Sequence, residues 1–242
     1  IPLFVSGHWV EDQEQQAVNE LMARRVDGMI VLAGRLGDRA LAAYARKVPL
    51  VVLGRKSAAS QVMSLTFDNR GGATMATRHL IEMGHRRIAY IAGDPAHADA
   101  LERLDGYRQA MQDAKLTVDP RLVVQGDFTE AGGMMAVNRL LDGQLPFTAI
   151  ACSNDQAAIG AMLALNRRNI RVPDDVSIIG FDDVAPARFS IPPLTSVHLS
   201  VYEAGEAVAR AMLGRLSGRE DKQPELPAPK LVMRESTRRV TR

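Results

Sequence analysis

The sequence predicts an α/β fold built on parallel sheets. Along the 242 residues, short apolar runs alternate with helical patterns of about ten to fifteen residues, which is typical of βαβ units with right-handed crossovers. The alternation breaks at residues 54–68 and again at residues 182–200, where polar or proline-containing stretches precede a short apolar run. Both breaks suit a chain that crosses between two lobes, so we expect two α/β lobes.

Strands are expected at the apolar runs, and helices where apolar side chains recur at i, i+3 and i+4. Ala17, Leu21 and Met22 form such a stripe in the first helix, and Ala73 and Leu80 belong to the stripe of the second. The expected strands are 3–6, 29–33, 50–53, 88–92, 122–125, 147–152 and 176–181, with shorter runs at 62–67, 195–199 and 231–234. The expected helices are 11–25, 69–83, 101–114, 130–141, 155 to about 169, and 202–216.

The most informative βαβ unit spans residues 148–184. Its first strand stops at residues 153–155, three polar residues that favour helix N-caps, and its second strand stops at Asp182 and Asp183. Polar side chains therefore follow the carboxyl ends of both strands. Because ligands bind outside these ends in open parallel sheets, we expect a binding site there.

The composition is that of an ordinary soluble globular protein, with 46% apolar and 24% charged residues. Thirty basic residues face twenty-eight acidic ones, giving a net charge of +2, so this segment is not expected to bind nucleic acid itself. A basic run at residues 234–242 is interpreted as a solvated tail, and contact with a phosphate backbone is the weaker alternative.

Several absences narrow the function classes. No apolar stretch approaches the ~20 residues that span a bilayer, and no signal-peptide pattern opens the chain. The chain lacks an initiator Met and starts in a strand-like run, so we expect it to be a fragment. Cys152 is the single cysteine, which excludes an internal disulfide and fits a reducing compartment. We expect neither a metal nor a cofactor.

Eight segments, in order and covering nearly the whole chain, carry a family resemblance. They are RRVDGMIVL (24–32), FDNRGGATMATRHLIEMGHRRIAYIAG (67–93), RLDGYRQAM (103–111), VVQGDFTEAGG (123–133), AIACSNDQAAIGAMLAL (149–165), VPDDVSIIGFDDV (172–184), PPLTSV (192–197) and LVMREST (231–237). With these segments the chain resembles the effector-binding core of lactose-repressor-type (LacI/GalR family) bacterial transcription regulators.

The resemblance implies the type I periplasmic-binding-protein architecture. This fold has two doubly wound parallel-sheet lobes joined by three crossovers, with the ligand in the cleft between the lobes. The N-terminal lobe would be residues 1–67 with 200–224, and the C-terminal lobe residues 68–199 with 225–242. The DNA-binding headpiece and the first strand–helix unit of the core are expected to be absent from this chain, so the ligand contacts named below are expected to be incomplete.

The resemblance also assigns ligand-binding residues. Arg103 would reach the ligand with a guanidinium fork that donates two parallel hydrogen bonds; the alternative is a surface arginine at a helix start. Asn154 would offer a donor and an acceptor. Its rival role is the helix N-cap, and the two roles are compatible if Ser153 or Asp155 caps the helix.

Two further residues match positions that face the ligand. Asp182 would accept hydrogen bonds from two hydroxyl groups, whereas its neighbour Asp183 is expected to face the loop. Phe128 would lie against a sugar ring, although as an isolated aromatic residue it would be assigned to the core.

Other positions depart from the family pattern or vary within it. Arg55 is retained, but Gly54 stands where a carboxylate is common, so the N-terminal lobe would be more cationic. Leu199 stands where glutamine is frequent, which removes a polar contact. His97 and Asp99 lie in a loop whose sequence varies with the ligand, and a solvated loop histidine is an equal alternative for His97.

The predicted function is therefore the effector-sensing and dimerisation core of a cytoplasmic repressor. A small polar molecule, expected to be a sugar or sugar derivative, would control operator binding allosterically, through a headpiece outside this chain. The lobe that contains residues 11–25 would pair subunits into a homodimer. Trp9 is assigned either to that interface or to the core.

Two alternatives from other classes remain. A periplasmic sugar-binding protein of a transporter would share the fold, although the ending RESTRRVTR favours the regulator. An enzyme is disfavoured because the sequence shows no nucleophile–base pair, no glycine-rich phosphate loop and no metal-spaced His/Cys set.

Overall fold

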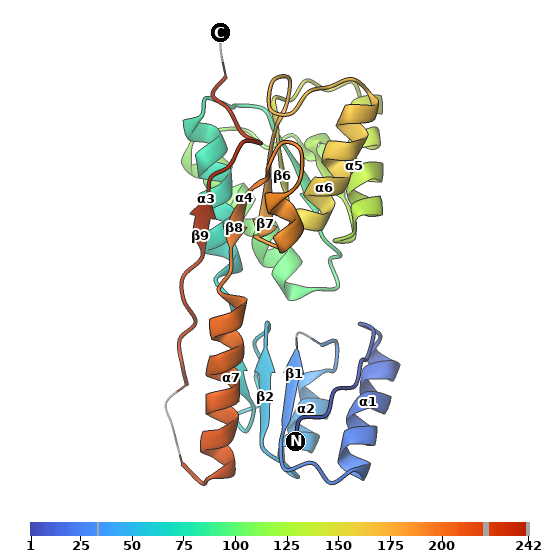
Figure 1. Ribbon diagram of the computed structural model, residues 1–242, viewed down its shortest axis with the longest axis vertical. Helices are drawn as coiled ribbons and strands as arrows, with labels where there is room; N and C mark the ends of the chain where they lie inside the picture. The colour runs from blue at the N-terminus through green and yellow to red at the C-terminus, as the bar shows by residue number, and fades with distance from the viewer. Residues whose placement is uncertain (33, 220–222, 241–242) are drawn as a thin grey trace. The chain divides into compact units, whose positions relative to one another are not determined.

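The structure is a computed structural model that describes residues 1–32, 34–219 and 223–240. The chain divides into two compact units: unit 1 is Ile1–Phe67 with Ser200–Pro227, and unit 2 is Asp68–Leu199 with Ala228–Arg242. The chain passes from one unit to the other three times, and the third passage falls at residues 227–228 rather than 224–225. Residue 33 of the expected strand 29–33 and residues 241–242 of the basic run lie outside the described residues. Figure 1 labels the elements.

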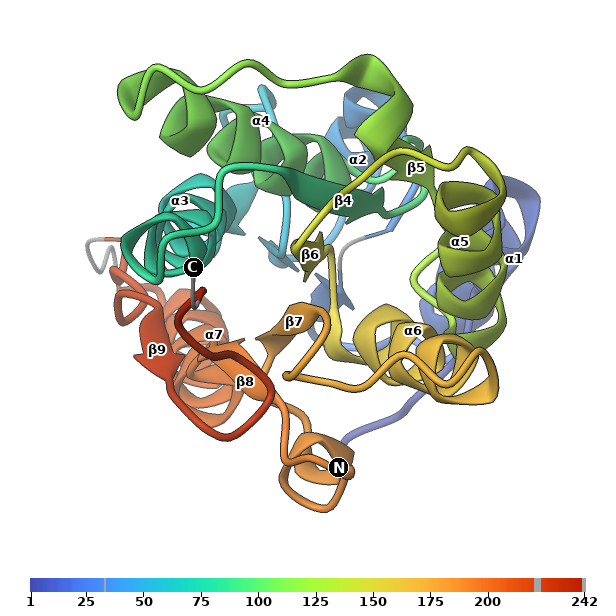
Figure 2. The same ribbon diagram turned by 90° about the horizontal axis from the view of Figure 1, so that it is seen from above.

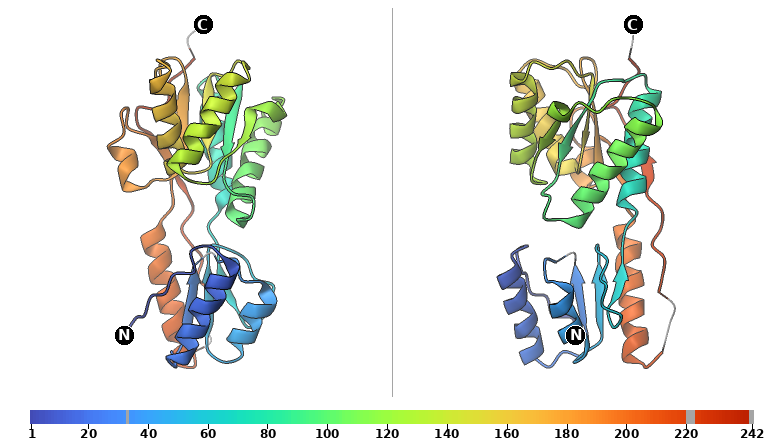
Figure 3. Two further views of the ribbon diagram at one scale, coloured as in Figure 1. Left: turned by 90° about the vertical axis from the view of Figure 1, so that its right-hand side faces the viewer. Right: turned by 180° about the vertical axis from the view of Figure 1, so that it is seen from behind.

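Unit 1 contains a three-stranded parallel sheet in the order β1-β2-β3. Side chains alternate along β2, so Leu50 and Val52 pack with α1 and α2, whereas Val51 and Leu53 pack with α7. Helices thus cover both faces of the sheet, and in the left view of Figure 3 the orange α7 lies opposite the blue α1 and α2. The bounds are α1 Glu11–Ala23, β1 Met29–Leu32, α2 Asp38–Ala45, β2 Leu50–Leu53, β3 Met63–Leu65 and α7 Val201–Leu216.

Two expectations for unit 1 were wrong. The apolar run 3–6 forms no strand, and its Phe4 side chain is fully exposed. An apolar run becomes a strand only where its backbone groups find a ladder partner, and β1 pairs with β2 alone among the described strands. The short helix α2 was not predicted, because its two buried core residues, Leu41 and Tyr44, are too few to show a period.

Unit 2 contains a six-stranded sheet in the order β5-β4-β6-β7-β8-β9, parallel except for β9. Helices α5 and α6 cover one face, and α3 and α4 cover the other, as Figure 2 shows. The strands are β4 Ile88–Ala92, β5 Val123–Gln125, β6 Ala149–Cys152, β7 Ser177–Asp182, β8 Thr195–His198 and β9 Lys230–Val232. The helices are α3 Asn69–Glu82, α4 Ala98–Asp113, α5 Glu130–Asp142 and α6 Asp155–Arg167, with 3-10 turns at Pro120–Leu122 and Ala185–Arg188.

The core of unit 2 follows from the alternation of side chains along its buried strands. Ala89 and Ile91 of β4 pack with α5 and α6 in one apolar cluster. Tyr90 stacks on Tyr107 of α4, with ring centroids 4.8 Å apart. The central strands β4 and β6 are buried on both faces, as expected for a parallel sheet between helix layers. None of the helices in the described ranges is both long and apolar enough to cross a membrane.

Candidate functional site at the carboxyl edge of unit 2

The carboxyl ends of β4, β5, β6 and β7 meet at one edge of the unit 2 sheet. The strand order reverses at β4, because β5 pairs with one side of this strand and β6 with the other. A reversal of this kind is the place where open α/β sheets bind ligands. Six of the seven expected contacts follow these strand ends: His97, Asp99, Arg103, Phe128, Asn154 and Asp182.

Arg103 lies at the centre of this edge, and its side chain is only 7% exposed. Its Nε donates to Asn69 Oδ1 at 2.9 Å, and its Nη1 donates to the Ser153 carbonyl at 2.7 Å. Nη1 is also 3.0 Å from Asp182 Oδ1. The guanidinium stacks on the Phe181 ring, 3.9 Å from its centroid. The alternative of a solvated surface arginine is therefore wrong.

One nitrogen of the Arg103 guanidinium, Nη2, makes no hydrogen bond to Asp99. It lies 3.9 Å from Asp99 Oδ2, which is beyond hydrogen-bond distance. The fork has five N–H donors, and the contacts above employ Nε and Nη1. Nη2 is thus the group that Arg103 can offer to a ligand.

Asp182 and Asp183 both adopt left-handed backbone conformations, with φ of +99° and +54°. Such conformations cost on the order of 1–3 kcal/mol each for residues other than glycine, so neighbouring contacts must hold them. Burial raises the pKa of Asp182, the nearby Arg103 lowers it, and Asp99 raises it. The Asp182 side chain keeps 28% of its surface exposed, which leaves it accessible as an acceptor.

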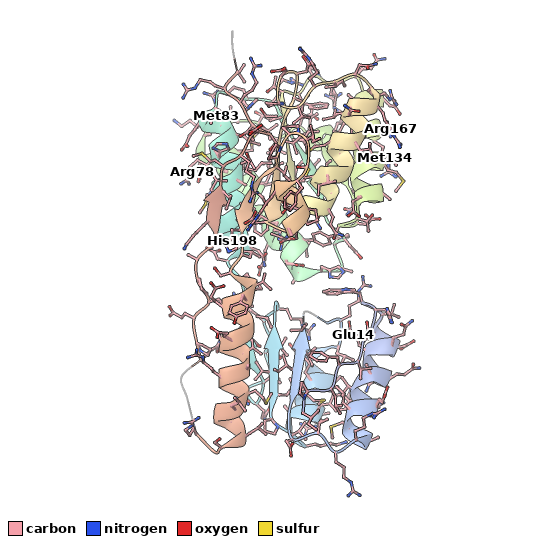
Figure 4. All side chains as sticks on the ribbon, in the orientation of Figure 1. Glu14, Arg78, Met83, Met134, Arg167 and His198 are labelled. Atoms are coloured by element: carbon pink, nitrogen blue, oxygen red, sulfur yellow. The ribbon has the colours of Figure 1, made fainter. Side chains whose placement is uncertain are left out.

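Asp183 does not face the loop as expected, because its side chain is only 4% exposed. It forms an ion pair with Arg234 and a hydrogen bond with His198, whose Nδ1 is 3.1 Å from Asp183 Oδ2. Figure 4 shows His198 at the end of β8. The positive φ angles stop the usual alternation of side chains at the end of β7, which explains the error.

Asn154 is itself the N-cap of α6, which is the rival role that the sequence left open for this residue. Its Oδ1 accepts from the Ala157 N–H at 2.9 Å, and its Nδ2 donates to the Phe128 carbonyl at 2.9 Å. An amide group has two N–H donors and two lone pairs, so one of each is left for a ligand. Asn154 can therefore be both the cap and a ligand contact.

Phe128 is half-buried beside the same strand ends, at a φ of +68°. Its ring meets the His97 ring edge-on, with centroids 5.8 Å apart. Gly93 makes this position available, because a Cβ there would lie 2.2 Å from the Phe128 ring. His97 Nε2 also lies 3.7 Å from Asp94 Oδ2, so this histidine is neither purely solvated nor isolated from charged neighbours.

Asp155, the first residue of α6, is a candidate functional residue that was not predicted from the sequence. Its side chain is completely buried, and its two oxygens accept from Ser196 Oγ at 2.6 Å and from the Val184 N–H at 2.8 Å. Burial raises the pKa of Asp155 to about 7, although these hydrogen bonds oppose the shift. An acidic first helical residue normally indicates only a favourable helix dipole, so the sequence offered no distinctive signal.

The seventh expected contact, Arg55, belongs to unit 1, just beyond the end of β2. Its guanidinium donates to the Leu36 carbonyl and lies 3.9 Å from Asp38. The Arg55 Nε is buried without a hydrogen-bond partner among the described residues. Gly54 precedes it at a φ of +97°, and Leu199, the other departure from the family pattern, is buried.

Within the described ranges, no group of three or more His, Cys, Asp or Glu side chains could hold a metal ion. The residues at the carboxyl edge of unit 2 instead combine hydrogen-bond donors, acceptors and one aromatic face. This set can bind a neutral polar molecule without any covalent chemistry.

Comparisons with known proteins agree with this geometry. The family model described as "Periplasmic binding protein-like domain" matches residues 77–237. The HTH-type transcriptional regulator GalR of Escherichia coli strain K12 is 36% identical over 238 residues, which are 97% of this chain and 69% of GalR. The HTH-type transcriptional repressor PurR of Haemophilus influenzae is 33% identical over 98% of this chain and 73% of PurR.

A solved structure supports the same relationship in three dimensions. The complex of the transcriptional regulator CelR with cellobiose superimposes with a TM-score of 0.84 at 35% sequence identity. The match covers 93% of this chain and 70% of the CelR chain.

Proposed function

This chain belongs to the LacI/GalR family of transcription regulators, and we propose that it is the effector-sensing core of a repressor that binds a sugar or sugar derivative. The single observation that carries the proposal is the pair between the buried Arg103 and the half-buried Asp182 at the carboxyl edge of unit 2. A buried charged pair with remaining hydrogen-bond capacity, at a strand-order reversal, is suited to binding a polar ligand.

The hydrogen-bonding groups at this edge suit a polyhydroxylated ligand. Nη2 of Arg103 offers donors, Asp182 offers acceptors, and Asn154 offers one of each. A hydroxyl group both donates and accepts, so vicinal hydroxyls can match this set, whereas an unmatched buried polar group costs about 1–3 kcal/mol. The half-buried ring of Phe128 supplies an apolar surface for the C–H face of a sugar ring. The cellobiose bound to CelR is consistent with this ligand class.

We propose His97, Asp99 and Arg55 as further contacts. His97 and Asp99 lie beside Phe128 and Arg103, respectively. Arg55 keeps a buried Nε without a partner among the described residues, and its unit lacks a carboxylate at Gly54. Effectors with an anionic substituent would gain most from Arg55.

Regulation would follow from differential affinity. An effector shifts the equilibrium between operator-competent and incompetent states only if it binds one state more tightly. Operator DNA would be bound by a segment outside this chain, and the regulator would act in the cytoplasm. The relatives are named transcriptional regulators and a repressor, which favours this function over a transport protein or an enzyme.

A thermal-shift screen tests the proposal. The protein would be screened against D-galactose, D-ribose, D-glucose, cellobiose, sugar phosphates, sugar acids and purines. A ligand at about 100 times its Kd stabilises the fold by about 2.7 kcal/mol, which is readily measured as a rise in Tm.

Substitutions at the site provide the control. Asp182→Asn and Arg103→Lys should each lose at least about tenfold in affinity, because the charge-assisted pair and its fork geometry are disrupted. Asp174→Asn is the matched control. Asp174 forms exposed ion pairs with Arg171 and Arg238 and lies just before the amino end of β7, so this variant should respond like wild type. A ligand that stabilises all four proteins equally would contradict the placement of the site.

A further inference from the structure

The turn at residues 182–184 carries the proposed effector contact Asp182 and needs external support. Asp182 and Asp183 have positive φ in succession, a conformation that side chains other than glycine rarely adopt. The two residues would not keep these backbone angles by themselves, so contacts from other elements must hold the turn in place.

Asp155 supplies that support through two routes. One of its oxygens accepts directly from the Val184 N–H at 2.8 Å. The other accepts from Ser196 Oγ at 2.6 Å, and Ser196 Oγ itself accepts from the Asp183 N–H at 3.2 Å. The Val184 N–H therefore donates directly to the Asp155 carboxylate, and the Asp183 N–H is linked to the same carboxylate through the Ser196 hydroxyl.

The hydrogen bonds to Asp155 are complete when this carboxyl group is ionised. Ser196 Oγ accepts from the Asp183 N–H and donates its O–H to one oxygen of Asp155, while the Val184 N–H donates to the other oxygen. An ionised carboxylate accepts on both oxygens, whereas a protonated carboxyl group carries an O–H on one of them and an amide carries an NH2 group in its place. Gly180 leaves room for this carboxylate, because a Cβ there would lie 2.1 Å from its Oδ1.

The two residues that precede Asp155 also form hydrogen bonds to residues of the candidate site. The Ser153 carbonyl accepts from Arg103, and the Asn154 amide holds the Phe128 carbonyl. One three-residue segment at the β6–α6 junction thus contacts the segments that present Arg103, Phe128 and Asp182.

We propose that Asp155, acting with Ser196, is a positioning residue of the effector site, which holds the 182–184 turn so that Asp182 faces Arg103. The inference rests on the proposed function in that Asp182 is taken as an effector contact. Asp155 itself would not touch the ligand, because its two oxygens are occupied and its side chain is buried.

Several charged groups surround this arrangement and define its pH behaviour. Asp182 and Asp183 face Asp155 from the end of β7, and Cys152 lies near it at the end of β6. Arg103 pairs with Asp182, whereas Arg234, Arg188 and His198 pair with Asp183. Protonating Asp155 would loosen the turn at low pH.

Amide hydrogen exchange measured by NMR on the 242-residue chain tests the proposal without any ligand. In Asp155→Asn, the NH2 group of asparagine replaces one acceptor oxygen, so either the Val184 N–H or the Ser196 O–H loses its acceptor. The Asp183 and Val184 amides should then exchange roughly tenfold faster relative to the rest of β7. In Ser196→Ala, only the Asp183 amide should be affected. In the wild type, protection of both amides, corrected for intrinsic exchange, should fall as the pH drops from 8 to 6, and this dependence should vanish in Asp155→Asn.

Ser177→Ala provides the matched control, since Ser177 is a buried serine at the opposite end of β7 that bonds Arg238. Ser177→Ala should not accelerate hydrogen exchange at the Asp183 and Val184 amides more than elsewhere in β7. Ser196→Ala removes a hydrogen bond that lowers the pKa of Asp155, so this variant makes Asp155 less charged near neutral pH. Less negative charge at Asp155 would by itself lower the pKa of Asp182, so a rise in the pKa of Asp182 in carboxyl ¹³C spectra would report a loosened Asp182–Arg103 pair.

Two results would overturn the proposal: unchanged exchange of both turn amides in Asp155→Asn, or acceleration spread uniformly over unit 2. Either result can be obtained whether or not a sugar binds, so a negative sugar screen would reject the ligand class and leave this test intact.

Discussion

Burial determines the chemistry of the charged side chains at the carboxyl edge of unit 2. Arg103 is held by Asn69, the Ser153 carbonyl and Asp182, so it acts as a fixed fork and not as a mobile charge. Asp155 is completely buried, and its pKa is raised to about 7. Ionising Asp155 therefore costs more free energy than ionising an aspartate on the surface.

Asp155 should make the stability of the protein depend on pH. Its folded-state pKa of about 7 lies above the ordinary value of 3.8, so the group favours folding at acidic pH. This contribution is fully present below pH 3.8 and is lost as the pH rises through about 7. The free energy of unfolding should therefore fall over that range by an amount, on the order of a few kcal/mol, that Asp155→Asn does not show.

Chemical denaturation of wild type and Asp155→Asn at pH 5, 6, 7 and 8 measures this difference. Comparing the two proteins removes the contributions of the other titrating groups. A difference in unfolding free energy that stays constant with pH would mean that Asp155 is not protonated in the neutral range.

At this scale, the sequence could name Arg103, Asn154, Asp182 and Phe128 only as candidate contacts, because these residues match family motifs. It could not identify Asp155 and Ser196, because their roles arise from contacts between β7, β8 and α6 that no local pattern encodes. The same reason explains the error at Asp183.

At the scale of elements, close helix contacts complete the fold of unit 2. Helices α5 and α6 approach each other through glycines: a Cβ at Gly160 would lie 1.9 Å from the Glu130 carbonyl oxygen, and a Cβ at Gly133 2.0 Å from that of Ala157. The glycines therefore allow backbone approach, although glycine weakens a helix in isolation.

Gly160→Ala and Gly205→Ala should have opposite effects on stability. Alanine at position 160 must push the two helices apart, which costs on the order of 1–3 kcal/mol of unfolding free energy. Gly205 lies in α7, and a Cβ added there would meet no neighbouring atom within 4 Å, so alanine should stabilise the helix by about 1 kcal/mol. Urea denaturation of both variants checks this, and equal signs would contradict the packing.

Helix and strand periodicity predicted most elements of both units, including α1. It failed where an element depends on its surroundings. The run 3–6 has the composition of a strand but lies unpaired among the described strands, and α2 forms with too few apolar residues to be recognised.

At the scale of the whole molecule, the two breaks in the alternation mark passages between the units, at residues 67–68 and 199–200. The third passage was placed three residues too early, because residues 220–229 are polar and proline-containing and show no periodicity. The family resemblance supplied the overall architecture, whereas the physical pattern alone indicated only two α/β lobes.

We propose that the chain forms a homodimer through the unit that contains α1, and sedimentation measures its association. Trp9 and Val10 beside α1 are about half exposed. A second copy of the chain would cover these apolar side chains. Trp9→Ser with Val10→Ser should therefore raise the dimer dissociation constant at least about tenfold, and an exclusively monomeric wild type at high concentration would contradict the dimer.

Hydrogen exchange mapped with and without the best sugar of the screen tests the central claim most directly. The account predicts that sugar binding slows exchange in unit 2 at residues 93–99, 126–129, 153–155 and 182–184, and that this protection disappears in Asp182→Asn. Protection confined to other parts of unit 2, with these four segments unchanged, would contradict it.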